Sequence, residues 1–90
     1  MAVDHGSTTF YDAHYNRGML HNKLGLFSQA VKDFDTAIEL NPKNASAFYK
    51  RGLTFNELGN PSRAIEYYKM AARLGFKAAQ DTLRAKGVSW

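Results

Sequence analysis

The chain has 90 residues, of which 44% are apolar and 22% are charged, and it contains no cysteine. This composition is typical of one soluble domain and excludes a disordered chain or a disulfide-stapled scaffold. A chain this short buries only about 60% of its unfolded surface, which leaves little room for a substrate cavity beside a core. No apolar run approaches the length of a membrane span, and the first ten residues lack a secretory pattern. We therefore expect a cytoplasmic protein without catalytic activity, cofactor or membrane segment.

The formal charge of +4 is distributed unevenly along the chain. Residues 1–40 contain three basic and five acidic residues, a net charge of −2, whereas residues 41–90 contain nine basic and three acidic residues, a net charge of +6. A basic half of this kind favours anionic partners. The same charges also suit solvated helix faces that keep a protein in solution. Both interpretations stay open at this point.

The first two helices are predicted at about residues 10–24 and 27–40. We expect the segment at residues 1–9 to be flexible, and Thr9 and Asp12 have the spacing of a capping box at the start of the first helix. The second helix is amphipathic, because its apolar residues recur at the spacing of one helical face: Ala30, Val31, Phe34, Ala37 and Ile38.

Three more helices are predicted in the second half, at about residues 45–58, 61–74 and 77–86. Asn44 is placed to cap the first of them, and Asn60 followed by Pro61 supplies a cap and a helix-starting proline for the next. Gly25 and Gly59 separate the two helices of each pair. Because glycine has no Cβ, these positions permit the left-handed turn that closes a helix.

The sequence repeats itself with a period of 34 residues. A shift by this period superimposes identical residues at 12 positions, including Tyr15 on Tyr49, Arg17 on Arg51, Gly18 on Gly52, Gly25 on Gly59, Ala30 on Ala64 and Ala37 on Ala71. Each unit is predicted to be one helical hairpin. The domain at residues 10–90 then consists of two repeats followed by a capping helix and tail, at residues 11–44, 45–78 and 79–90.

Gly18 and Gly52 lie inside predicted helices at the same point of each unit. Glycine there costs about 1 kcal/mol relative to alanine, so its recurrence needs a reason. Close approach of the two helices of a hairpin supplies one. Small residues recur on the second helix of each unit in the same way: Ala30, Ala37, Ala64 and Ala71.

A helical hairpin of 34 residues with glycine and alanine at these points resembles the tetratricopeptide repeat. The positions that carry the resemblance are His14, Gly18, His21, Ala30, Phe34, Ala37 and Pro42 in the first unit and Phe48, Gly52, Phe55, Ala64, Tyr68 and Ala71 in the second. The second unit departs from the family at Phe76, where proline is usual. The resemblance implies an all-α fold, a right-handed stack of two helix-turn-helix hairpins plus a C-terminal capping helix, monomeric or weakly dimeric.

In proteins similar to this one, the first helices of successive units line a concave groove that holds a partner peptide. Mapped residue by residue, the resemblance implies a groove formed by Tyr15, Asn16, Met19, Asn22, Tyr49, Lys50, Leu53, Asn56 and Arg84. The mapping also includes Asp12, Lys23, Ser46, Glu57 and Gln80. Lys50 and Arg84 are expected to flank one carboxylate of an acidic peptide. Tyrosine and methionine at helical spacing are equally compatible with packing inside the hairpins.

His14 and His21 share a helix face, but two helical turns separate them by about 10 Å, so one metal ion does not reach both. They align with Phe48 and Phe55 of the second unit. We therefore interpret them as half-buried packing residues, and we expect no metal site.

Arg17 and Arg51 recur at a position that is normally apolar or neutral, and Asp33 and Asp35 lie on the neighbouring helix. We interpret these charges as structural ion pairs whose arginine stems pack against the hairpin.

Residues for chemistry are missing: there is no phosphate-binding glycine loop, no pair of catalytic carboxylates and no cysteine nucleophile. The favoured function is an adaptor or scaffold that binds a peptide of a protein partner and takes no small-molecule substrate. Two alternatives stay open, a structural oligomerisation module and the binding of nucleic acid or an anionic surface through residues 41–90. Nucleic acid is disfavoured because the basic residues are scattered over both helices of the hairpin.

Overall fold

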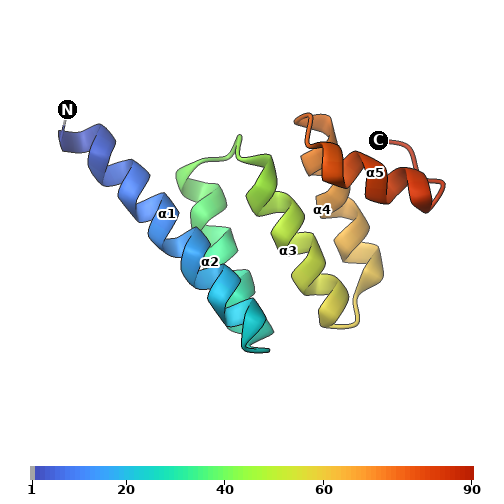
Figure 1. Ribbon diagram of the computed structural model, residues 1–90, viewed down its shortest axis with the longest axis horizontal. Coiled ribbons are helices and arrows are strands. Elements are labelled where there is room, and N and C mark those ends of the chain that lie inside the picture. Colours follow the sequence, from blue (N-terminus) through green and yellow to red (C-terminus); the bar gives the residue numbers. More distant parts are fainter. Residues whose placement is uncertain (1) are drawn as a thin grey trace.

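A computed structural model describes the backbone of residues 2–90 and the side chains of residues 11–90. Within these residues the chain forms five α-helices and no strands, arranged as two antiparallel hairpins and a final helix (Figure 1). The helices are α1 (Ala2–Lys23), α2 (Phe27–Leu40), α3 (Ala45–Glu57), α4 (Pro61–Arg73) and α5 (Lys77–Ala85). They stack in a body of 45 × 28 × 15 Å, with α1 and α5 at opposite ends. The predicted all-α stack of hairpins is confirmed.

The start of α1 differs from the prediction. The helix begins at Ala2, so the predicted start at residue 10 is wrong by eight residues, and Thr9 lies inside the helix instead of capping it. No proline interrupts the preceding residues, and each residue added to an existing helix gains a hydrogen bond without a new nucleation step. The flexibility expected for residues 1–9 stays a prediction, and Met1 lies outside the described residues. None of the described helices is both long and apolar enough to cross a membrane.

The predicted caps at Asn44 and Asn60 and the predicted turns at Gly25 and Gly59 are confirmed. The side-chain oxygen of Asn44 accepts the backbone N–H of Ala47 at 3.1 Å, and that of Asn60 accepts the N–H of Arg63 at 3.2 Å. Gly25 closes the first hairpin with φ of +79°, a left-handed conformation that other residues rarely adopt.

Close approach of the paired helices explains the two glycines inside helices. A Cβ atom placed on Gly18 would lie 2.8 Å from the Phe34 ring, and one placed on Gly52 would lie 2.7 Å from the Tyr68 ring. The aromatic side chains of α2 and α4 therefore pack directly on the backbone of α1 and α3. The predicted small residues of α2 and α4 are all buried: Ala30, Ala37, Ala64 and Ala71.

The last helix closes the stack on α4. Phe76, which stands where the family usually has proline, precedes α5 and packs its ring against Tyr49 with 5.3 Å between the ring centroids. Leu83 of α5 is fully buried, and Val88 and Trp90 fold back against the same core. The C-terminal residues thus cover the apolar face of the second hairpin.

Candidate functional site

A pocket of about 490 Å³ lies between the C-terminal half of α1 and α3. Three apolar side chains, two amides and two lysines line it: Met19, Leu20, Leu53, Asn16, Asn22, Lys23 and Lys50. Met19 is 40% exposed and Leu20 is 54% exposed, so their apolar surface is accessible to a ligand. Within residues 11–90 neither lysine is in an ion pair. The pocket therefore combines open apolar surface with positive charge that no described carboxylate neutralises.

Asn22 is held at the pocket by the next hairpin. Its side-chain oxygen lies 3.0 Å from the hydroxyl of Thr54, which is fully buried. The same hydroxyl lies 2.9 Å from the backbone carbonyl of Lys50. These contacts fix the position of the Asn22 amide and join α1 to α3 below the pocket.

Tyr15 and Tyr49 contact the first helix of the following unit rather than line the pocket. The Tyr15 hydroxyl lies 2.5 Å from that of Ser46 in α3, and the Tyr49 hydroxyl lies 3.3 Å from that of Thr82 in α5. Both rings are only partly exposed. Their hydroxyl groups therefore serve the stacking of successive first helices.

Asn56 and Arg84 also lie outside this pocket. Arg84 pairs with Asp81 at 3.3 Å, and its guanidinium carbon lies 5.3 Å from the ring centroid of Trp90. It lines a separate depression of about 360 Å³ formed with the C-terminal residues. The structure thus does not place Arg84 beside Lys50, and Lys23 is the second cation at the pocket.

The structure therefore brings together five of the nine groove residues that the resemblance implied: Asn16, Met19, Asn22, Lys50 and Leu53. Leu20 is the lining residue that sequence reasoning missed. Its equivalent in the second unit is Thr54, which is buried under α1, whereas Leu20 is 54% exposed and no element among the described residues covers it. The replacement of a buried Thr54 by Leu20 in the first unit could have indicated that Leu20 lines an open surface.

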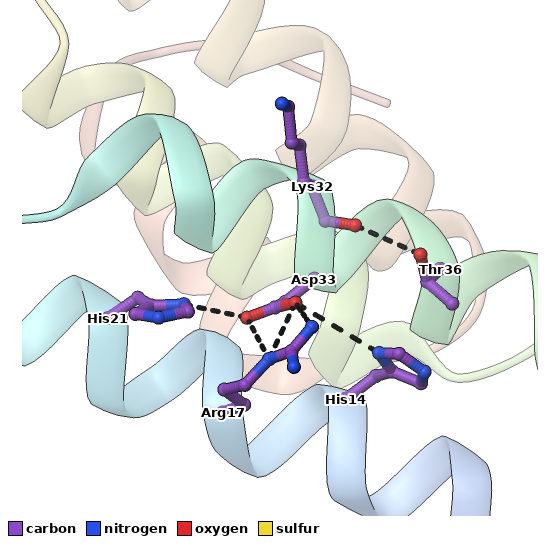
Figure 2. Close-up of polar contacts among 6 residues, drawn as sticks. All are labelled: His14, Arg17, His21, Lys32, Asp33 and Thr36. Atoms are coloured by element: carbon purple, nitrogen blue, oxygen red, sulfur yellow. Dashed lines mark hydrogen bonds and ion pairs between the residues drawn. The ribbon is translucent and has the colours of Figure 1, made fainter.

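A second polar constellation joins α1 to α2 around the buried carboxylate of Asp33 (Figure 2). Arg17 donates through Nη2 to Oδ1 at 2.6 Å and through Nε to both oxygens at 3.1 Å, and Nδ1 of His21 lies 2.7 Å from Oδ2. Nδ1 of His14 lies 4.0 Å away. The predicted Arg17–Asp33 ion pair and the half-buried histidines are confirmed, but their convergence on one carboxylate was not predicted.

The charge state of Asp33 follows from these contacts. Burial by itself raises the pKa of this carboxyl, but the hydrogen bonds from Arg17 and His21 and the positive charge of Arg17 outweigh it, so the pKa lies below its ordinary value. Asp33 is therefore ionised at neutral pH. A buried ionised carboxylate needs such partners, which explains why the three α1 side chains gather there. Among the described residues no cluster that could hold a metal ion is found.

Arg51 occupies the equivalent position in the second unit but has different neighbours. It pairs with Asp35 of α2 at 2.5 Å, as predicted. Its guanidinium carbon lies 4.3 Å from the ring centroid of Tyr67 and 5.3 Å from that of Phe55. Tyr67 and Phe55 replace Asp33 and His21 of the first unit, so a cation–π stack stands where the first unit has a polar cluster.

The fold and the pocket define a class of protein, an all-α stack of helical hairpins with an open pocket between two successive first helices. Two family models described as tetratricopeptide repeat match the chain, at residues 11–44 and 34–66. The chain belongs to the tetratricopeptide repeat family. No curated protein matches it. Repeats of this family are generally protein–protein interaction modules and are typically non-catalytic.

Proposed function

We propose that the protein binds a peptide segment of a partner protein in the pocket between α1 and α3, and that this segment carries an aliphatic side chain next to an acidic one. The observation that carries the proposal is the pocket of about 490 Å³, in which Met19, Leu20 and Leu53 lie beside Lys23 and Lys50. Its volume falls in the range of ligand-binding clefts, and its exposed apolar surface has no cover among the described residues.

The lining chemistry specifies what such a peptide contributes. Burying one leucine-sized side chain against the apolar residues stabilises a complex by about 1.5–3 kcal/mol. The two lysine ammonium groups attract a carboxylate, and the amides of Asn16 and Asn22 pair with main-chain N–H and C=O groups. Contacts of this number support micromolar affinity, which corresponds to about 8 kcal/mol.

The distribution of the basic side chains supports a protein partner rather than a nucleic acid. Arg51 is directed at Asp35 and Tyr67 inside the stack, and Lys77 and Arg84 both pair with Asp81. The remaining basic residues of the second half are spread over the loops, α3, α4 and the C-terminal turn. A nucleic-acid surface requires such charges on one face with aromatic rings free for stacking.

The test is a selection of short peptides on the full chain, followed by titration calorimetry at low and moderate salt. Selected sequences are expected to place Asp or Glu beside Leu, Ile or Met. The double variant Asn16→Ala/Lys50→Ala is expected to weaken binding at least tenfold, because two anchors of about 1–2 kcal/mol each are lost. The matched control Lys32→Ala/Lys69→Ala removes two lysines from the second helices and is expected to leave the affinity unchanged.

Two outcomes contradict the proposal. The first is that the control pair weakens binding as much as the pocket pair. The second is that duplex DNA displaces the selected peptide as well as unlabelled peptide does, which would transfer the function to the basic half of the chain.

A further inference from the structure

The first helix of the second hairpin, α3, buries one face against the first hairpin. On this face Ala47 and Thr54 are 0% exposed and the Arg51 side chain is 15% exposed. Both helices of the first hairpin cover it, since Asn22 of α1 contacts Thr54 at 3.0 Å and Asp35 of α2 pairs with Arg51 at 2.5 Å. A face of this kind is completed by a pair of helices whose second member supplies a carboxylate.

The same face recurs on α1, where no described residue covers it. A shift of 34 residues maps the buried face of α3 onto Ala13, Arg17 and Leu20. The Arg17 side chain is 59% exposed, Leu20 is 54% exposed, and Ala13 is exposed as well. In the part of the chain that the structure describes, no helix lies beyond α1 at this end of the stack (Figure 1). We call these three residues the open face of α1.

The opposite end of the stack is closed. Leu83 of α5 is 0% exposed, and the chain after α5 folds back so that Arg73 donates to the backbone carbonyl of Trp90 at 3.0 Å. This end therefore offers no free pair of helices that a second copy of the chain could place on the open face of α1. The partner that fits the open face is a different helical protein.

We propose that the open face of α1 is a second interaction surface, which meets the peptide pocket only at Leu20 and docks a helical hairpin of a partner protein with a carboxylate on the second helix of that hairpin. The partner's carboxylate forms an ion pair with Arg17, in the way that Asp35 forms one with Arg51. A guanidinium group has five N–H donors, and among residues 11–90 only Asp33 accepts from Arg17, through Nε and Nη2, so Nη1 has no acceptor in this part of the chain and can donate to a second one. Arginine is suited to bridge two carboxylates in this way.

The other positions on α1 specify the rest of the partner. Leu20 replaces the buried Thr54, so the partner places an apolar side chain where α1 places Asn22 on α3. Ala13 replaces the fully buried Ala47, so the two helices approach closely at this point. The open face of α1 therefore fits a partner hairpin that places an apolar residue on Leu20 and a carboxylate on Arg17, and that approaches α1 closely at Ala13.

The probe is a lengthened chain in which a further copy of residues 11–44 precedes Tyr11 and carries Asn22→Leu in the added unit. Covalent linkage raises the effective concentration of the added hairpin, so even weak docking is observed. The melting temperature of the lengthened chain is expected to exceed that of the original chain by about 5 °C or more. Asp35→Asn in the added unit is expected to remove part of this gain.

The decisive comparison uses Ala13→Gln in both chains. In the original chain this exposed substitution is expected to shift the melting temperature by no more than about 2 °C, whereas in the lengthened chain it overpacks a buried contact and lowers it by about 5 °C or more. Ala47→Gln in the original chain calibrates the effect at the buried equivalent. The proposal is overturned if Ala13→Gln has the same effect in both chains, or if hydrogen exchange finds the added unit unprotected. These readouts concern stability alone, so they are independent of peptide binding in the pocket.

Discussion

Gly52 offers the most direct test of the close approach between α3 and α4. An alanine Cβ at this position would lie 2.7 Å from Cε1 and 2.8 Å from Cδ1 of Tyr68, and 3.1 Å from the backbone carbonyl of Ala64. Carbon atoms in favourable contact are about 3.5–4.0 Å apart, so Gly52→Ala requires the Tyr68 ring or the helix α4 to move away. The ring of Tyr68 is only 3% exposed, and the Ala64 carbonyl moves only with the helix.

Two effects of Gly52→Ala oppose each other. Alanine in place of glycine inside a helix stabilises by about 1 kcal/mol. Overpacking a well-packed core costs about 1–3 kcal/mol, and the upper part of this range applies because the Tyr68 ring is confined by Tyr49, with 5.4 Å between their centroids. The expected net loss is about 1–2 kcal/mol, which lowers the melting temperature of a domain of this size by about 5–15 °C.

Thermal denaturation followed by circular dichroism measures this loss. Ala13→Gly, at an exposed position of α1, measures helix propensity alone and is expected to cost about 1 kcal/mol. Combining Gly52→Ala with Tyr68→Leu makes room for the added methyl group, so the two changes are expected to be non-additive, with the double variant losing less than the sum of the single losses. A melting temperature that rises in Gly52→Ala would show that the helices do not approach this closely.

The other predictions concern the polar contacts and the last helix. Asp33→Asn is expected to lower the unfolding free energy at pH 7 by about 2–3 kcal/mol, because Arg17 loses its charged partner. Because the pKa of Asp33 is lowered in the folded chain, its contribution to the unfolding free energy is complete above about pH 4 and is lost as the pH falls through the folded pKa. Asp33→Asn is therefore expected to lose less stability in acid than the original chain does. Identical dependence of the unfolding free energy on pH in the two chains would contradict this. Thr54→Val keeps the side-chain shape but removes the contact with Asn22, and urea denaturation is expected to show an unfolding free energy lower by about 1 kcal/mol. An unchanged unfolding free energy would show that this hydroxyl contact does not stabilise the fold. Deletion of residues 77–90 exposes the apolar face of α4 and is expected to lower the melting temperature sharply or cause aggregation, whereas an unchanged melt would show that α5 covers nothing.

The repeat made most of the fold predictable. Because the second helices carry apolar residues at helical spacing and Gly25 and Gly59 end the first helices, four of the five helices begin at the predicted residue and end within one residue of the prediction. Gly18 and Gly52 predicted close approach, since only tight packing explains glycine inside a helix at both places. The start of α1 was not predictable from the same signals, because Phe10 stands at the position equivalent to the capping residue Asn44 and does not mark a helix start.

The site was only partly predictable, for reasons that lie in tertiary contacts. The location of Asn16 and Lys50 at the pocket was predictable from the repeat, since residues one period apart face the same side of the stack. The position of the Arg84 side chain was not predictable, because its stacking on Trp90 depends on how the chain folds back after α5. Likewise, the convergence of three side chains on Asp33 depends on the helix crossing and not on spacing along α1 alone.

Nuclear magnetic resonance tests whether the surface between α1 and α3 binds a peptide. The isotope-labelled full chain is titrated with an acidic, leucine-containing peptide from the selection, and the amide shifts are mapped on the structure. The largest shifts are expected on residues of the pocket in α1 and α3: Asn16, Met19, Leu20, Lys50 and Leu53. Shifts centred on α2 and α4, or on the depression around Arg84 and Trp90, would contradict it.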